Sequence, residues 1–535
     1  MSQSRRAGRG LNLEQSGLTA RQKSAEGVVV RTTWPNAKGR IPTVQTRSHA
    51  DQGPNGVKVE GLPSAQDRID RTMDAKRQTT RQNPDRATPG DGEAVNEGAS
   101  GQETPMSSRE PIGPPEQLDP LTMEVVLDKT NLQTALSRVM ANKGAAGVDG
   151  MTVEQLPDYL WSSWSTIRQQ LLDGHYKPQP VRRVYIPKPD GSQRALGIPT
   201  VLDRFIQQAL LQALSPRWEP TFSDHSFGFR PGRSAHQAIE RAQGYITEGH
   251  GWVVDIDLEK FFDRVNHDML MGKVMKRVQD GRIVKLIRSY LNAGVMENGL
   301  VSSSDGEGTP QGGPLSPLLS NLVLDELDKE LEKRGHKFVR YADDCNIYVG
   351  SERAGRRVME SISDFITRKL KLKVNASKSA VDRPGRRKFL SFSFTFGPKP
   401  KRRIAPKAIE KMKKRVRELT KRTRGVDAKR MVQTLSVYLR GWIGYFGHCQ
   451  TPSVLEGLDS WIRRRLRAVA WKQWKRGPRR FKELRRRGVG KDLAAQSAGS
   501  MHNVWRLSRS PALSIALPNR LWESLGLPKL SAGVR

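Results

Sequence analysis

Residues 337–349 read KFVRYADDCNIYV and place two adjacent aspartates, Asp343 and Asp344, between two short β-favouring runs. The runs at 338–341 and 347–349 predict a β-hairpin with the acids at or beside its turn. A tight turn holds the two carboxylates close together, where they repel each other. Such a pair is stable when water solvates both groups, as is usual for an isolated dipeptide, or when a hard cation such as Mg²⁺ binds between them.

A second acidic stretch, residues 251–263, reads GWVVDIDLEKFFD and favours the cation over the solvated turn. Its apolar residues predict a buried strand, and a rigid sheet can aim the side chains at a strand end into a cleft. Asp255 and Asp257 lie two positions apart and share one face of that strand. One of these carboxylates, together with Asp343 and Asp344, would hold two metal ions for in-line phosphoryl transfer.

The formal net charge of this 535-residue chain is +36, which predicts a polyanionic partner and binding that weakens as salt rises. An anionic membrane surface is the alternative partner. However, no apolar run approaches the roughly 20 residues of a membrane span, and the N-terminus lacks the apolar core of a signal peptide. The two cysteines, Cys345 and Cys449, exclude a disulfide framework and a four-cysteine zinc site. A reducing, intracellular location follows from that cysteine usage.

The composition divides the chain into an arm and a folded part. Residues 1–118 are rich in Arg, Gln, Ser, Gly, Pro and Thr, show no helical or strand period, and are expected to be disordered. Apolar residues at helical spacing predict a helix over 131–142 that Gly144 stops. Past residue 400 the chain becomes basic and helical, with expected helices over 408–423 and 432–446.

Residues 181–200 predict a strand, a Pro-Asp-Gly turn and a second strand. Lys188 and Arg194 lie near the tip of this hairpin. A triphosphate is bound by such point charges and forked donors. Ordinary basic residues on a surface hairpin explain the two positions equally well.

Five further motifs follow one another along the chain in a recognisable order. They are DRFIQQ at 203–208, SFGFRPGRS at 226–234, GTPQGGPLSP at 308–317, LKLKVNASKS at 370–379 and FLSF at 389–392. With the two acidic stretches, they resemble the motifs of group II intron-encoded reverse transcriptases from about residue 120 to the C-terminal region. Ser391 is a departure, because the family usually has glycine there, and it puts the shape of the primer-gripping turn in question.

The resemblance implies an α+β fold shaped as a right-hand polymerase, with fingers and palm at 119–398. A helical thumb or maturase domain is expected at 399–476, and a basic region that could bind DNA at 477–535. The family can continue into a zinc-linked His-Asn-His endonuclease. No cysteine follows Cys449 and only His502 remains downstream, so that endonuclease is expected to be absent. A nick or nascent strand made elsewhere would then supply the DNA primer.

The resemblance also implies roles for single residues. Asp257 is preferred over Asp255, because its spacing to Phe262 matches the family; with Asp343 and Asp344 it would be catalytic and bind two Mg²⁺ ions, with Mn²⁺ as a possible substitute. Phe262 would close the floor under the ribose and exclude a 2′-hydroxyl, although packing beside Phe261 is an alternative for this ring.

Other implied contacts lie around the nucleotide and on the thumb. Lys188 and Arg194 would hold the triphosphate, and Gln311 would lie against the incoming nucleotide or template. Lys378 would protonate pyrophosphate, contact a phosphate or be a plain surface lysine. A-form duplexes are recognised by backbone and shape, and the expected nucleic-acid contacts of the thumb are Arg440, Arg463, Arg464, Arg467, Lys472 and Lys475.

The expected function is that of an RNA-directed DNA polymerase encoded by a group II intron, which assists splicing and copies the intron during retrohoming. Its partners would be the intron RNA, an RNA template with a DNA primer, dNTPs and target DNA, inside a bacterium or organelle, with no membrane partner. One alternative is a splicing-only maturase, which would have no need for clustered acids. Another is a reverse transcriptase of the same lineage used in DNA repair or defence.

Overall fold

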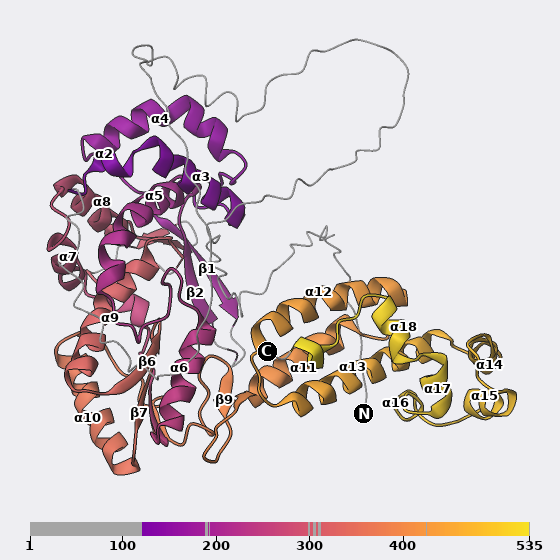
Figure 1. The fold of residues 1–535 in the computed structure, drawn as a ribbon. Coiled ribbons are helices and arrows are strands. Elements are labelled where there is room, and N and C mark those ends of the chain that lie inside the picture. The colour runs from indigo at the N-terminus through magenta and orange to yellow at the C-terminus, as the bar shows by residue number, and fades with distance from the viewer. Residues whose placement is uncertain are drawn as a thin grey trace, which may run out of the picture.

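The computed structural model describes residues 120–187, 191, 193–297, 300–302, 306–308, 312–423 and 425–533. The arm at 1–118 and the predicted site residues Lys188 and Gln311 lie outside these ranges. The described chain has a mixed helix-and-sheet part and a helical part that extends from one side of it (Figure 1). The predicted α+β class is therefore confirmed. Among the described residues, no helix combines the length and apolar character needed to cross a membrane.

The N-terminal layer consists of four helices and a small sheet. The helices are α2 (Met123–Val126), α3 (Lys129–Asn142), α4 (Leu156–Leu172) and α5 (Val201–Trp218), the last followed by the 3₁₀ turn η1 (Glu219–Thr221). The sheet has the order β2-β1-β4-β5, with β1 (Val181–Pro187), β2 (Gln193–Ile198), β4 (Val295–Glu297) and β5 (Leu300–Ser302). α3 contains the helix predicted over 131–142, and the antiparallel β1–β2 pair is the hairpin predicted over 181–200.

The palm is a second sheet of order β6-β7-β3-β8, in which every pair is antiparallel. Its strands are β3 (Trp252–Ile256), β6 (Lys337–Tyr341), β7 (Asp344–Val349) and β8 (Ala380–Asp382). The helices around it are α6 (Ala235–Thr247), α7 (His267–Met275), α8 (Gly281–Asn292), α9 (Ser316–Lys333) and α10 (Glu352–Arg368), and the turn η2 (Phe261–Asp263) follows β3. α10 packs on β3 because Val358, Ile362 and Ile366, four positions apart, form one buried stripe.

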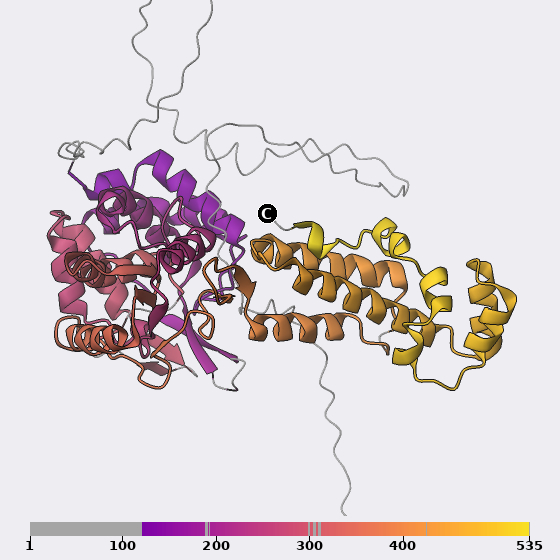
Figure 2. The ribbon, with the colours of Figure 1, turned by 60° about the horizontal axis from the view of Figure 1, so that its bottom comes forward.

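The helical part begins after a two-stranded hairpin of β9 (Phe392–Phe394) and β10 (Arg402–Ile404). Its three long helices lie side by side in both views (Figures 1 and 2). They are α11 (Pro406–Leu419), α12 (Ala428–Phe446) and α13 (Pro452–Gln473). Shorter elements follow: α14 (Gly477–Arg486), α15 (Lys491–Ala498), α16 (Val504–Leu507), α17 (Pro511–Ala516), α18 (Asn519–Ser524) and η3 (Leu530–Gly533).

One hydrophobic core crosses the boundary between the palm and the long helices. It joins Tyr245 of α6 and Val339 of β6 to Leu439 of α12. Polar contacts reinforce the junction, because Gln243 of α6 donates hydrogen bonds to the Pro400 carbonyl (2.6 Å) and to the Gln450 side chain (2.8 Å). The palm and the helical part are therefore packed against each other at their junction.

Candidate active site

The β6–β7 hairpin places Asp343 and Asp344 at its turn. Tyr341 pairs with Asp344, so Ala342 and Asp343 form a two-residue loop. This confirms the hairpin predicted from the sequence. Ala342 has φ +58°, which is uncommon for a residue other than glycine. A positive φ at the first loop position is typical of a tight hairpin turn whose twist matches the strands.

Asp257 lies next to this turn because β3 pairs with β7. Ile256 is opposite Cys345 in the register, so the residue after β3 reaches the start of β7. A loop from further along the chain fixes the backbone of Asp257. Its N–H donates to Ser379 Oγ (3.0 Å), and its carbonyl accepts from the Asn375 N–H (2.8 Å).

The carboxylates are close enough to perturb one another. Burial raises the pKa of Asp344 to about 7, and the nearby charges of Asp255, Asp343 and Asp257 add to the effect. Burial also raises the pKa of Asp343; Asp257 raises it further, whereas Arg194 and Arg340 lower it. The charged forms are thus disfavoured in this corner of the protein, and a cation bound there would stabilise them.

Asp255 and Asp257 differ in their partners. Arg387 donates two hydrogen bonds to Asp255 Oδ2, at 2.9 Å from Nε and 2.5 Å from Nη2. Asp257 Oδ2 is buried and accepts no hydrogen bond from the described residues. The ammonium of Lys378 lies 3.4 Å from that oxygen as an ion pair. Asp255 is therefore neutralised within the fold, whereas Asp257 keeps an oxygen for a further ligand.

This arrangement suits a metal ion that binds together with a substrate. In the described part of the chain, no group of three or more His, Cys, Asp or Glu side chains is placed to hold a metal ion. Mg²⁺ usually takes one or two carboxylates and fills its other positions with water and substrate phosphates. A buried oxygen on Asp257 and two crowded acids in a turn fit that mode of binding.

The other residues predicted to bind the nucleotide differ in their burial and their neighbours. Phe262 lies in η2, and its half-buried ring meets the buried Phe261 edge to face, with centroids 5.1 Å apart. Arg194 lies on β2 opposite Ile186, and its positive charge lowers the pKa of Asp343. Lys378 is mostly exposed. Their roles in binding a nucleotide stay predictions.

Three of the predicted thumb contacts also bind C-terminal segments of the chain, and their roles in binding nucleic acid stay predictions. Arg463 of α13 pairs with Glu523 at 3.3 Å. Arg464 stacks on Trp505, 3.8 Å from the ring centroid, and Arg467 donates to the Leu517 carbonyl at 3.1 Å. The remaining three candidates are exposed: Arg440, Lys472 and Lys475.

Sequence reasoning did not single out Arg387 or Arg340, although both lie among the carboxylates. Arg387 follows Asp255 by 132 positions, and no spacing rule joins them. A usable signal existed: a buried acid needs a cation, and the run RPGRRK at 383–388 comes between two predicted motifs.

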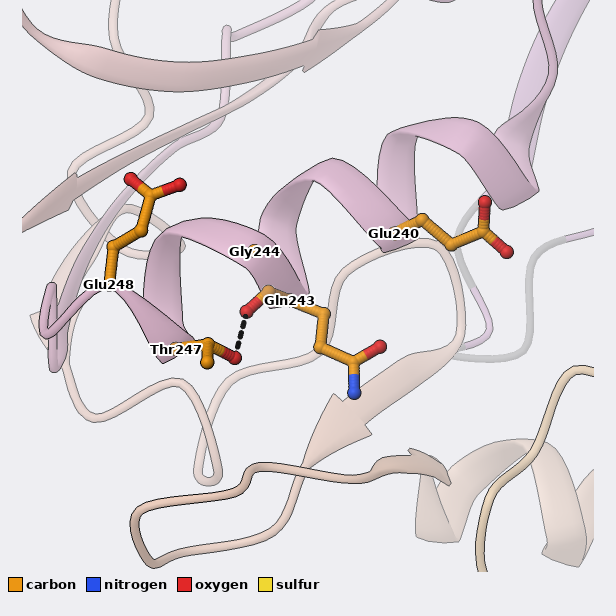
Figure 3. A pocket seen from close by; sticks show the side chains of 5 residues that line it. All are labelled: Glu240, Gln243, Gly244, Thr247 and Glu248. Atoms are coloured by element: carbon orange, nitrogen blue, oxygen red, sulfur yellow. Dashed lines mark hydrogen bonds between the residues drawn. The ribbon is translucent and has the colours of Figure 1, made fainter. Parts of the chain in front are cut away.

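A separate pocket lies on the outer side of α6. Its volume is about 480 Å³. Figure 3 shows its lining residues: Glu240, Gln243, Gly244, Thr247 and Glu248. The Thr247 hydroxyl donates to the Gln243 carbonyl at 2.9 Å. None of the predicted site residues lines this pocket, and its two glutamates would repel phosphate, so it does not fit a nucleotide or nucleic acid.

Two family models match the chain. Residues 186–394 match "Reverse transcriptase (RNA-dependent DNA polymerase)", and residues 409–488 match "Group II intron, maturase-specific domain". These matches confirm the resemblance stated from the motifs.

Similar proteins match shorter portions. Protein YkfC of Escherichia coli K12 is 44% identical over 209 residues, which cover 38% of this chain and 55% of YkfC. Group II intron-encoded protein LtrA of Lactococcus lactis subsp. cremoris is 40% identical over 207 residues, 38% of this chain and 34% of LtrA. The match thus spans about half of one relative and a third of the other. A solved structure, a partial Cas6-RT-Cas1–Cas2 complex, is 24% identical over 46% of this chain and 42% of its own, with a TM-score of only 0.31.

Proposed function

Because this chain belongs to the family of group II intron reverse transcriptases and maturases, we propose that it is an RNA-directed DNA polymerase. It binds its parent intron RNA, assists splicing and copies the RNA into DNA during retrohoming. It acts inside a bacterium or organelle, where intron RNA, dNTPs and target DNA are present.

One observation supports the polymerase activity: Asp257 lies close enough to Asp343 and Asp344, at one corner of the palm sheet, to raise the pKa of both, and the pKa of Asp344 is raised to about 7. Crowding acids where desolvation disfavours their charged forms costs free energy, and a scaffold protein has no need for such a cluster. A splicing-only maturase would need the basic helices but not this cluster.

The residues of the chain divide the work of nucleotide addition. Divalent metal ions, Mg²⁺ or alternatively Mn²⁺, would be held by Asp257, Asp343 and Asp344 and would supply activation of the primer 3′-hydroxyl and neutralisation of the leaving pyrophosphate. Arg194 binds the triphosphate. Phe262 lies under the ribose and excludes a 2′-hydroxyl.

Three further residues complete the proposed nucleotide site. Lys378, 3.4 Å from Asp257, donates a proton or a hydrogen bond to the leaving phosphate. Lys188 and Gln311 would join Arg194 around the nucleotide, on segments outside the described residues.

The helical part binds structured RNA and the template–primer duplex through exposed cations. Arg440, Lys472 and Lys475 are exposed on or beside α12 and α13. α14 and the residue before it add a further set of exposed cations for target DNA: Arg476, Arg479, Lys482, Arg485 and Arg486. Such surfaces bind phosphates without reading sequence, so binding should be salt-dependent.

Primer extension on an RNA template with dNTPs and Mg²⁺ tests the proposal. Wild type should extend the primer, and Asp343→Ala should not, while both bind intron RNA equally. Asp364→Ala, which removes an exposed acid on α10, is the matched control and should extend as wild type does. If wild type binds intron RNA and promotes splicing but does not extend the primer, the protein is a splicing-only maturase. Extension without any effect on splicing would favour a role in DNA repair or defence.

A further inference from the structure

Arg340, three residues before Asp343, is wholly buried and uses its full set of donors. Its Nε and Nη2 bind the two oxygens of Asp328 at 2.7 and 2.5 Å. Nη2 also donates to Ser226 Oγ at 2.7 Å. Nη1 donates to Asn321 Oδ1 at 3.0 Å and to the carbonyl of Ala342 at 2.9 Å. One side chain therefore joins α9, the segment at 226 and the turn that carries the acids.

Stability alone does not explain this network. Both side chains of the Arg340–Asp328 pair have zero exposure, and the loss of hydration on burying two charges offsets much of their attraction. A well-packed apolar pair of similar volume is often equally stable. What an apolar pair cannot do is hold the Ala342 carbonyl in one direction.

The Ala342 backbone needs such support, because its φ of +58° is strained for alanine. A second restraint on the turn comes from residue 228. A Cβ on Gly228 would lie 2.1 Å from the Ala342 nitrogen, so residue 228 runs directly against the loop. Asn321 Nδ2 in turn donates to the Gly228 carbonyl at 2.9 Å.

The same segment is also joined to Arg340 through the backbone. The Phe227 N–H donates to the Arg340 carbonyl, and the Arg340 N–H donates to the His225 carbonyl, both at 2.9 Å. Ser226 thus forms a single parallel β-bridge with Arg340 of β6. The segment at 225–228 and the guanidinium group both lie against the turn.

We infer that Arg340 is a positioning residue for the reaction: through the Ala342 carbonyl it keeps the strained turn in the one conformation that presents Asp343 correctly. Gly228 is the complementary part, because a side chain at this position would clash with the backbone of Ala342. The inference rests on the polymerase function proposed above. It assigns no contact between Arg340 and any substrate.

Two variants test the inference independently. Arg340→Lys keeps the charge beside Asp328, but an ammonium cannot reach four partners in the fixed geometry of a guanidinium. Gly228→Ala changes no charge and pushes on the turn. The matched control is Arg282→Lys. Arg282 of α8 also binds two acids through its guanidinium, Asp280 and Glu124, but contacts neither the turn nor residues 225–228.

The measurement is single-nucleotide addition per active site on a preformed template–primer duplex, with thermal unfolding measured alongside. Arg340→Lys and Gly228→Ala should lower kcat about 100-fold, as expected for misplacement by about 1 Å. KM for dNTP and Kd for the duplex should change less than about twofold, because the contacts that bind the substrates equally well in the ground state and the transition state are unaffected. Mn²⁺ binding to the duplex complex, followed by electron paramagnetic resonance, should weaken in both variants and stay unchanged in Arg282→Lys.

The outcomes separate this inference from the proposed function. Wild type without extension would overturn the polymerase proposal and this inference with it. If wild type extends, and Gly228→Ala or a folded Arg340→Lys matches its kcat, the positioning role alone is wrong. An equal loss of kcat in Arg282→Lys would likewise overturn it, since the effect would then reflect general structural damage. If Arg340→Lys fails to fold, Gly228→Ala decides.

Discussion

Asp255 lies on the central palm strand and Asp257 directly follows it, and Arg387 binds the first of them. Asp255 accepts both of its short hydrogen bonds from that arginine, whereas Asp257 keeps an oxygen without a hydrogen bond from the described residues. The same guanidinium also donates to the Lys378 carbonyl at 2.6 Å. Arg387 thus supports both the strand and the loop that carries Lys378.

Removing this arginine should destabilise the palm. Arg387→Ala leaves Asp255 largely buried without its cation and should lower the free energy of unfolding by about 2 kcal/mol, between the values for exposed and fully buried pairs. Denaturant titration measures the change. Arg386→Ala, which breaks the mostly exposed pair with Asp382, should cost less than about 0.5 kcal/mol. Equal losses in the two variants would contradict the proposed neutralisation of Asp255.

Substitutions of the two phenylalanines in η2 can distinguish a role in core packing from a role in substrate selection. Phe262→Ala should reduce discrimination against ribonucleotides by about tenfold or more, because a bulky group no longer fills the space of the 2′-hydroxyl. Competition between dNTP and NTP in primer extension measures this. Phe261→Leu alters the buried partner and should lower stability while leaving discrimination unchanged. Unaltered discrimination in Phe262→Ala would leave core packing as the role of that ring.

At the scale of elements, the turn that leads toward the helical part is also strained. Leu390 and Ser391 both have positive φ, +49° and +67°, between Phe389 and Phe392, which exchange two backbone hydrogen bonds. Tyr445 of α12 donates to the Leu390 carbonyl at 2.8 Å and holds the turn from outside. The serine that departs from the family pattern thus has the backbone conformation that glycine adopts without strain.

Ser391→Gly should therefore stabilise the protein. Relief of the left-handed strain, offset by the greater chain entropy of glycine, gives an expected gain of about 0.5–1 kcal/mol in the free energy of unfolding. Ser393→Gly, on the buried strand β9, should instead destabilise by about 1 kcal/mol. Chemical denaturation of both variants tests the contrast, and a loss of stability in Ser391→Gly would disprove the strain.

Basic residues on and just beyond α13 should separate into two functional classes. Lys472→Ala should weaken RNA binding at all sequences and reduce the salt slope of log K by about 1. Arg464→Ala should lower stability by about 1–2 kcal/mol through loss of its stack and hydrogen bond with Trp505. Filter binding at several salt concentrations, paired with thermal unfolding, measures both. A larger change in salt slope for Arg464→Ala than for Lys472→Ala would reverse the assignment.

The elements that sequence alone predicted were those with local signals. The hairpin at 337–349 and the helix at 131–142 depend on residues a few positions apart, and both are present. Arg463, Arg464 and Arg467 were predicted as nucleic-acid contacts, but their partners lie 41 to 60 positions later. Helical spacing shows that these arginines share a surface. It does not show that a later segment of the chain covers that surface.

On the scale of the whole molecule, the site combines motifs from distant parts of the chain. Motif order allowed Asp257, Asp343 and Asp344 to be predicted as one cluster, and the pairing of β3 with β7 brings their segments together. Which arginine binds which acid could not be predicted, because burial and charge compensation depend on the assembled fold. Arg340 illustrates this, since its role follows from five hydrogen bonds to four residues.

The core shared by the palm and the long helices has a mechanical consequence. Tyr245 and Val339 pack in one cluster with Leu439, and Tyr445 donates a hydrogen bond to the carbonyl of Leu390 in the turn before β9. Moving the helical part away from the palm would expose that cluster to water, at a cost of about 25 cal/mol for each Å² of apolar surface. The helical part is therefore fixed to the palm and does not swing on a hinge. Under the proposed function, a template–primer duplex would advance along a surface that keeps its place from one nucleotide addition to the next.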